Sequence, residues 1–306
     1  MGTPDFAVSS LAAIVAAGFP VTAVITAPDK PAGRGMKMTE SAVKKFAIEK
    51  GLPVLQPEKL KNPAFIESLK ALHADIQVVV AFRMLPEIVW NMPPMGTINL
   101  HGSLLPQYRG AAPINWAVIN GEKETGVTTF KLKHEIDTGD ILLQERFPIG
   151  DDENAGSVHD RMKEIGATLL VKTLQGLQDG TLKEQPQQQL MAAPDHSEVQ
   201  LKHAPKIFTE TCLIDWNKSV SEIHNLIRGL SPFPTAFTYL HGKTLKIYAG
   251  KKESSTPGVA PGEWSTDHKT WLKCAAQDGY ISVEELQLEG KKKMSTAEFL
   301  RGYRFP

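Results

Sequence analysis

Three side chains in this sequence are of the types that acyl transfer requires, namely Asn99, His101 and Asp137. Asn99 and His101 are two residues apart in the β-branched and apolar stretch 97–101, which predicts a strand. Side chains two apart in a strand share a face, so both should point the same way at the strand's end. Open α/β sheets bind ligands at that edge. A neutral amide donor and an imidazole can together stabilise the oxyanion that forms when a carbonyl becomes tetrahedral.

Asp137 lies in the run Glu135-Ile136-Asp137-Thr138-Gly139-Asp140, on the loop that follows the next expected strand, 127–132. We expect neighbouring strand ends to bring this loop beside Asn99 and His101. A carboxylate next to an imidazole can fix its tautomer, favour its charged form or relay a proton through a water. Taken singly, each residue is more often structural, and Asp-Thr-Gly-Asp is a common turn composition. The combination is what indicates a site.

The elements that must position these residues alternate along the first 180 residues, where helical apolar spacing is interrupted by short β-branched runs. This alternation predicts an α/β fold with a Rossmann-like, open and mostly parallel sheet. The chain begins Met1-Gly2-Thr3-Pro4 and runs directly into an expected helix, 6–17, whereas such a sheet normally begins with a strand. We therefore expect the first strand to be missing. The predicted strands are 21–26, 53–56, 76–82, 97–101, 127–132 and 141–147.

Residues 185–204 are rich in Gln, Pro, Asp and His without an apolar period, which predicts a linker between domains 1–184 and 205–306. The second domain should contain a helix, 220–230, and a hairpin of strands 236–240 and 243–248. A capping box from Ser295 to Glu298 begins its last helix. Several short strands with a helix favour an OB-like β-barrel, with a sandwich as the alternative.

Composition excludes several classes of protein. The formal net charge of zero over 306 residues argues against nucleic-acid binding by bulk electrostatics, so any RNA contact must be local. The apolar stretches are too short to cross a bilayer and no leader is recognisable, so we expect a cytoplasmic protein. Cys212 and Cys274 lie far apart, which indicates neither a zinc site nor a disulfide framework. Gly33-x-Gly35 lacks the third glycine of a dinucleotide loop.

The string Asn99-x-His101-x-Ser103-Leu104-Leu105-Pro106-x-Tyr108-Arg109-Gly110, followed by Asp137-Thr138-Gly139-Asp140, resembles the signature of the 10-formyltetrahydrofolate-dependent formyltransferases. The resemblance covers nearly the whole chain and is strongest to the branch that acts on initiator methionyl-tRNA. It implies a folate co-substrate, no metal, and attack of a neutral α-amine on the formyl carbon. Asn99 and His101 would hold the oxyanion, and Asp137 would assist proton movement.

The resemblance also implies a folate site formed by residues 103–106, with the pterin held near Ala81 to Leu85. In the pterin segment, relatives usually carry Ala-Tyr-Gly-x-Ile-Leu-Pro. This chain reads Ala81-Phe82-Arg83-Met84-Leu85-Pro86, so that Arg83 replaces the glycine. Backbone contacts could survive this change. The residues implied in folate binding are Phe82, Arg83, Leu85, Ser103, Leu104, Leu105, Pro106 and Asp140.

Residues 28–38 form a basic, glycine-containing loop that composition alone would assign to the solvated surface. The resemblance implies instead that it enters the acceptor stem of tRNA. In this loop the residues predicted to bind tRNA are Lys30, Arg34 and Lys37. In the second domain a small excess of basic residues adds Lys243 and Lys246 as a candidate tRNA patch, with a solvated face as the alternative. We expect a monomer. Two alternatives stay open, a formyltransferase for an amino sugar or other small amine, and a nucleic-acid-binding protein without activity.

Overall fold

The computed structural model describes residues 1–32, 37–190 and 200–304. Contacts divide the chain into two compact units. The first comprises Met1–Gly110, Gly126–Phe147 and His159–Lys202, and the second comprises Ala111–Thr125, Pro148–Val158 and His203–Pro306. The chain therefore passes between the units several times, and residues 185–190 and 200–202 of the predicted linker belong to the first unit.

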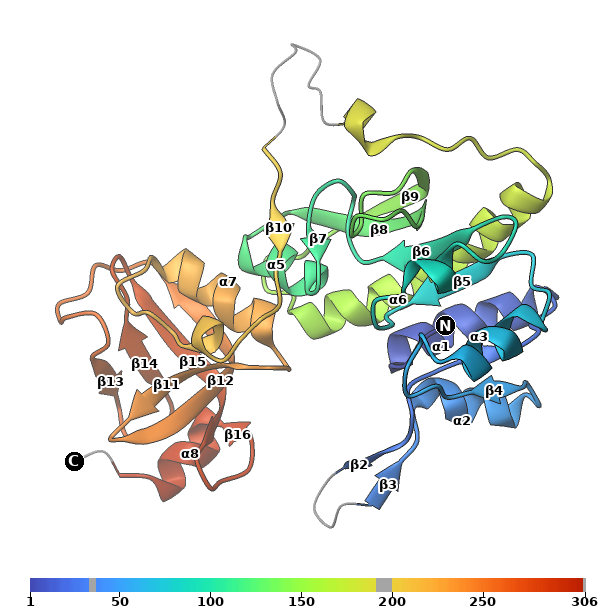
Figure 1. The fold of residues 1–306 in the computed structure, drawn as a ribbon. Coiled ribbons are helices and arrows are strands. Elements are labelled where there is room, and N and C mark those ends of the chain that lie inside the picture. Colours follow the sequence, from blue (N-terminus) through green and yellow to red (C-terminus); the bar gives the residue numbers. More distant parts are fainter. Residues whose placement is uncertain (33–36, 191–199, 305–306) are drawn as a thin grey trace. The chain divides into compact units, whose positions relative to one another are not determined.

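The first unit is built on parallel and antiparallel strands flanked by helices (Figure 1). β1 (Val24–Ile25) and β4 (Val54–Leu55) form a parallel pair. A second sheet has the order β5 (Gln77–Val80), β6 (Thr97–His101), β8 (Glu124–Lys131) and β9 (Ile141–Pro148). All six predicted strands are confirmed: β1, β4 and β5 are shorter than predicted, β6 has the predicted bounds, and β8 and β9 are longer. The helices are α1 (Asp5–Ala16), α2 (Ala42–Glu49), α3 (Pro63–Lys70), α4 (Glu87–Trp90) and α6 (Ala155–Gln178).

Met1 and Gly2 occupy the position of the expected first strand, between β1 and β5. Gly2 forms a parallel bridge with Val80 and donates its N–H to the oxygen of Ile25 at 3.0 Å. A side chain at Gly2 would meet the Cβ of Ala7 at 2.5 Å, so this position is tightly packed. A mainly apolar cavity of about 490 Å³ lies beside these two residues, lined by 19–25 and 72–78 among others.

The direction of β8 differs from our expectation. β5 and β6 are parallel, but β8 is antiparallel to β6, with His101 opposite Thr128 and Ile98 opposite Lys131. The loop that carries Asp137 therefore leaves the sheet beside the start of β6 and not beside its end. The expected meeting of strand ends was wrong, because a buried apolar run predicts a strand without its direction.

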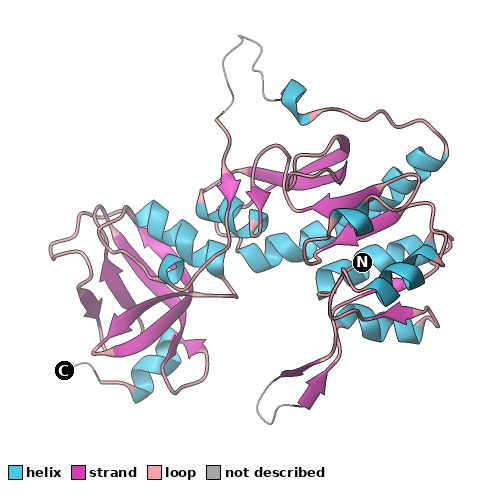
Figure 2. Cartoon of the chain, in the orientation of Figure 1, coloured by secondary structure: helices cyan, strands magenta, loops and turns pink. Residues whose placement is uncertain are grey.

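The second unit contains a curled antiparallel sheet that is consistent with the predicted OB-like domain (Figure 2). Register shifts between Ile247 and Gly250 interrupt the pairing of β12 (Lys243–Glu253) with β15 (Tyr280–Leu288), which allows strong local twist. The predicted capping box is confirmed at Ser295 and Glu298. The elements are α5 (Pro113–Ile119), α7 (Val220–Leu230), β11 (Ala236–Leu240), β12 (Lys243–Glu253), β13 (Trp264–Thr266), β14 (Leu272–Ala275), β15 (Tyr280–Leu288), β16 (Met294–Ser295) and α8 (Thr296–Gly302).

Each unit has its own apolar core. In the first unit, buried residues of β1, α3, β5 and α4 pack together, including Ile25, Ile66 and Val89. In the second unit, one face of α7 packs with the inner face of the curled sheet, including Ile223, Leu245 and Ile281. None of the helices in the described part of the chain is both long enough and apolar enough to cross a bilayer.

Candidate active site

β6 places Asn99 and His101 on the same face of the sheet. Asn99 lies opposite Val79 of β5 and Phe130 of β8, and its side chain is partly exposed. His101 is the last residue of β6 and is only 6% exposed. Its ring stands edge-on to Phe130, with the centroids 6.4 Å apart. The strand therefore gives one amide that solvent can reach and one imidazole held in a fixed orientation.

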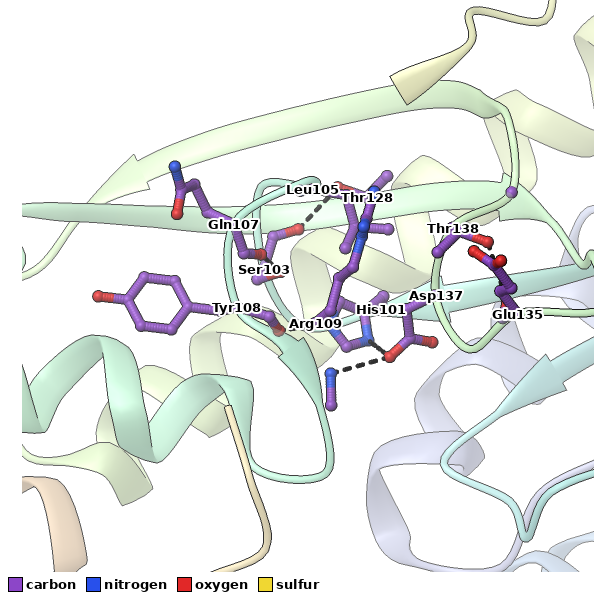
Figure 3. A network of polar contacts seen from close by, with 12 residues as sticks. His101, Ser103, Leu105, Gln107, Tyr108, Arg109, Thr128, Glu135, Asp137 and Thr138 are labelled. Atoms are coloured by element: carbon purple, nitrogen blue, oxygen red, sulfur yellow. Dashed lines mark hydrogen bonds and ion pairs between the residues drawn. The ribbon is translucent and has the colours of Figure 1, made fainter. Parts of the chain in front are cut away.

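Both ring nitrogens of His101 face protein atoms. Nε2 lies 2.9 Å from the carbonyl oxygen of Tyr108. Because a carbonyl oxygen only accepts, Nε2 must carry the proton in this contact. Nδ1 lies 3.9 Å from Oδ2 of Asp137, and the two side chains point toward one another (Figure 3). This separation is longer than a hydrogen bond but short enough for attraction between an imidazolium and a carboxylate.

Asp137 reaches His101 because the loop between β8 and β9 folds back along the sheet. Lys131 donates its N–H to the oxygen of Asp140 at 3.0 Å, which closes the loop. Gly139 lies so close to this strand that a Cβ would be 1.6 Å from the oxygen of Lys131. Asp137 has a φ of +55°, a left-handed conformation, and its Oδ2 accepts a hydrogen bond of 2.9 Å from the N–H of Gly110. The carboxylate is thus directed back toward the end of β6.

Arg109 and Gln187 complete this region, and neither was predicted from the sequence. The Arg109 guanidinium donates to the side-chain oxygen of Gln187 through Nε at 3.1 Å and through Nη2 at 2.5 Å. Burial lowers the pKa of Arg109, while the nearby carboxylates of Asp137 and Glu135 raise it. Arg109 stands within the motif that carried the resemblance, but Gln187 lies in a stretch whose composition indicates a linker.

Residues 103–106, predicted to line the folate site, form a loop held from inside the protein. Ser103 is fully buried and donates its hydroxyl to the oxygen of Gln107 at 2.6 Å. Thr128 of β8 donates its hydroxyl to the oxygen of Ser103 and accepts the N–H of Leu105. Leu105 and Pro106 are also buried, whereas Leu104 is partly exposed. This loop would meet a ligand through its backbone and through Leu104.

The segment predicted to hold the pterin begins with Ala81, whose φ is +45°. Phe82 is partly buried against the first core and Leu85 is 8% exposed within it. Arg83 turns away to the neighbouring loop, where its guanidinium donates to the main-chain oxygens of Pro57 and Glu58. The arginine that replaces the family glycine therefore anchors this segment.

Asp140, the last residue predicted to contact folate, is engaged within its own loop. Its carboxylate lies 2.7 Å from the ammonium of Lys133, and 14% of its side chain is exposed. Asp140 also follows directly on Gly139 and closes the loop through its main-chain oxygen. The structure thus places Asp140 at the base of the loop whose tip carries Asp137.

The predicted tRNA loop forms a hairpin of β2 (Lys30–Ala32) and β3 (Lys37–Thr39), which projects from the first unit (Figure 1). Lys30 is exposed, Lys37 lies in β3, and Arg34 lies outside the described residues. At the base of the hairpin, the ammonium of Lys44 lies 2.5 Å from Asp29 and 3.0 Å from Glu40. Gln56 donates to the other oxygen of Asp29 at 2.8 Å. The pKa of Asp29 is lowered by these hydrogen bonds, that of Lys44 first, and the pKa of Lys44 is raised by the same pairing.

The two lysines predicted in the second unit lie on β12. Lys243 begins the strand opposite Leu240, and Lys246 lies opposite Phe237. Lys243 is exposed and Lys246 is half-buried. Other lysines of this sheet are neutralised locally, as Lys251 is by Glu284 at 2.6 Å and Lys293 by Glu285 at 2.6 Å. Lys251 and Lys293 therefore contribute less positive charge to a large anion than their exposure alone would indicate.

Comparison with known proteins identifies both halves of the chain. The family model described as "Formyl transferase" matches residues 1–174, and that described as "Formyl transferase, C-terminal domain" matches residues 206–304. Proteins named methionyl-tRNA formyltransferase are similar over 99% of this chain and 94% of their own length. The identity is 52% for that of Bacteroides fragilis, 54% for Parabacteroides distasonis and 56% for Phocaeicola vulgatus.

Solved structures share the fold at lower identity. WlaRD, a sugar 3N-formyl transferase crystallised with dTDP and 5-N-formyl-THF, superposes with a TM-score of 0.66 at 20% identity over 95% of this chain and 97% of its own. The N-formyltransferase of Helicobacter canadensis, in complex with folinic acid and dTDP-3-aminofucose, gives 0.63 at 19% identity over 96% and 97%. HypX of Aquifex aeolicus, with tetrahydrofolic acid, gives 0.59 at 20% identity over 83% of this chain and 43% of its own.

Proposed function

This chain belongs to the methionyl-tRNA formyltransferase family, and from that premise we propose that Asn99, His101 and Asp137 carry out its reaction. The reaction moves the formyl group of 10-formyltetrahydrofolate to the α-amino group of initiator methionyl-tRNA. The observation that carries the assignment is the approach of Asp137 to His101 at 3.9 Å, although 36 positions separate them in the sequence. Identity above 50% along the whole chain favours the tRNA substrate over an amino sugar.

In the proposed mechanism the neutral amine attacks the formyl carbon, and the carbonyl oxygen becomes an oxyanion. Asn99 donates its side-chain N–H to this oxygen, because its amide is the partly exposed polar group on the face of β6. The amine nitrogen then loses a proton to Asp137. The oxyanion returns to a carbonyl as the bond between the formyl carbon and N10 of the folate breaks, and Asp137 gives the proton to N10. Tetrahydrofolate and formylmethionyl-tRNA leave.

His101 and Asp137 act as a coupled pair in this scheme. The carbonyl of Tyr108 holds Nε2–H, so that a second proton on the ring lies on Nδ1, facing Asp137. His101 then stabilises the oxyanion together with Asn99, and Asp137 accepts the proton released by the amine. The N–H of Gly110 donates to Oδ2 of Asp137 at 2.9 Å and so orients this carboxylate toward the ring of His101.

The test is to supply 10-formyltetrahydrofolate together with charged initiator methionyl-tRNA, and in parallel with candidate amino sugars. We expect formyl transfer to the tRNA with a kcat/KM at least 100-fold above any sugar, the order of discrimination that one specific site provides. Transfer to a sugar alone would overturn the proposal.

Two further expectations belong to this proposal. We place the enzyme in the cytoplasm, where charged tRNA is used, and we expect it to act as a monomer. Sedimentation of the purified protein at several concentrations checks the second point, since a self-association would raise the apparent mass with concentration.

A further inference from the structure

Gln187 is a fully buried polar side chain that joins the loop Glu135–Asp140 to Arg109, the residue before Gly110. It belongs to a short 3₁₀ helix, η1 (Gln187–Leu190). Gln187 has no exposed surface, whereas Gln188 and Gln189 beside it are exposed. The preceding Gln185 pairs with Ile141 at the start of β9, which fixes the entry to this helix. Leu190 packs against Leu105, Phe130 and Ile141.

The side-chain nitrogen and the side-chain oxygen of Gln187 both form hydrogen bonds to these segments. Its nitrogen donates to the main-chain oxygens of Asp137 at 2.9 Å and Gly139 at 2.8 Å. Its oxygen accepts from Nε and Nη2 of Arg109. The opposite orientation of the amide would set its NH₂ group against the guanidinium and its oxygen against two carbonyls, so the contacts define the orientation.

These contacts act on the backbone that orients the Asp137 carboxylate. Asp137 has a left-handed φ of +55°, which a non-glycine residue keeps only where its surroundings hold it. Gln187 holds the main-chain oxygen of Asp137, and Gly110 holds the carboxylate from the other side. Through Arg109, Gln187 also fixes the residue adjacent to Gly110. One side chain therefore links both supports of Asp137.

We propose that Gln187 is a positioning residue, which sets the carboxylate of Asp137 relative to His101 and so determines the rate of formyl transfer. The proposal rests on the proposed function, because it acts through Asp137. Gln187 itself needs no contact with the folate or the tRNA. Its amide supplies two donors and an acceptor within one buried group, a combination that neither Glu nor Met can replace.

Two variants distinguish the hydrogen bonds that Gln187 donates from those that it accepts. Gln187→Met keeps the volume and removes all of the hydrogen bonds. Gln187→Glu keeps an acceptor for Arg109 and sets a carboxylate against the oxygens of Asp137 and Gly139. We expect both to lower the single-turnover rate by roughly 10- to 100-fold, with the KM for tRNA and folate changed less than threefold, because small misplacement of a reacting group has effects of this order. Gln189→Met, on the same short helix but exposed, is the matched control and should retain the wild-type rate.

The decisive experiment measures the single-turnover rate of Gln187→Glu and Gln187→Met when each is combined with Asp137→Ala. If Gln187 acts by positioning Asp137, neither substitution should lower the residual rate further, whereas a general structural role would lower it by the same factor as in the wild type. Thermal melts identify a variant that fails to fold, in which case the other variant decides. Wild-type rates in both Gln187 variants would overturn the proposal while leaving the proposed function intact. Absence of formyl transfer to tRNA by the wild type would overturn the proposed function instead.

Discussion

The loop Glu135–Asp140 and the hairpin of β2 and β3 both extend from the sheets of the first unit, but they are held by different contacts. The loop is folded back on β8, with Gly139 against Lys131 and a buried glutamine bonded to its main chain. The hairpin is held at its base by the pair of Asp29 and Lys44. A loop that must place one carboxylate accurately is bonded along its length, whereas a hairpin proposed to meet a large nucleic acid needs only its direction fixed.

The largest effect is expected when the carboxylate of Asp137 is removed. Asp137→Ala should lower kcat by about 100- to 10,000-fold, the usual contribution of a positioned acid or base, with little change in tRNA affinity. Rapid-quench single turnover with labelled formylfolate measures the rate. Glu135→Ala, in the same loop but exposed, should stay within threefold of the wild type. Equal losses for the two variants would remove Asp137 from the mechanism.

A second test displaces the loop without touching its carboxylate. Gly139→Ala would bring a methyl group to 1.6 Å from the oxygen of Lys131, so the loop must move. We expect kcat to fall by about 100-fold and stability to fall by roughly 1–3 kcal/mol. Gly258→Ala, where nothing lies within 4 Å, is the control and should alter neither. A fully active Gly139→Ala enzyme would show that the accurate fold-back is not required.

The hairpin should respond in binding rather than in rate. Lys30→Ala removes an exposed cation from β2 and should raise the KM for methionyl-tRNA by roughly three- to tenfold, with the salt dependence of binding reduced by about one ion. The KM for folate should not change. Lys70→Ala, an exposed lysine on α3, is the control. A loss of kcat at saturating tRNA would contradict the division between the two regions.

The smallest effect is expected at the base of the hairpin. Asp29→Ala should raise the KM for tRNA by about threefold or less, because surface ion pairs contribute little. The pKa of Asp29 is lowered from 3.8, so its contribution is present above pH 3.8 and is lost as the pH falls through the lowered value. The pKa of Lys44 is raised from 10.5, so its contribution is lost only as the pH rises beyond that. The difference between wild type and variant should thus be constant from about pH 5 to 9, which a KM series across this range checks.

The sequence predicted the elements better than their directions. The apolar runs located the six strands β1, β4, β5, β6, β8 and β9, and the Ser295–Glu298 pattern located a helix start, because local residue types determine both. The antiparallel direction of β8 has no such local signal. The hairpin at Lys30 to Thr39 was expected only as a loop, since its proline and glycines are unusual in strands.

The same limit applies to the site. Asn99 and His101 share a face because of strand alternation, which the spacing predicted. Asp137 approaches His101 by a route that the sequence did not reveal, through its own left-handed backbone and a glycine packed on β8. Gln187 lies in a polar run that is typical of linkers, and its burial depends on partners that are remote in the sequence. A signal for it would have required pairing Gln187 with Arg109 from many related sequences.

The most direct test of the proposed mechanism is a double-mutant cycle between His101 and Asp137, which we propose to act as one coupled pair. Single-turnover formyl transfer is measured for His101→Gln, Asp137→Asn and the combination of both, with melting curves to verify folding. Coupling predicts that the double variant is within about threefold of the slower single variant. A loss of rate equal to the product of the two separate losses would show that the residues act independently and would contradict the proposed coupling of His101 and Asp137.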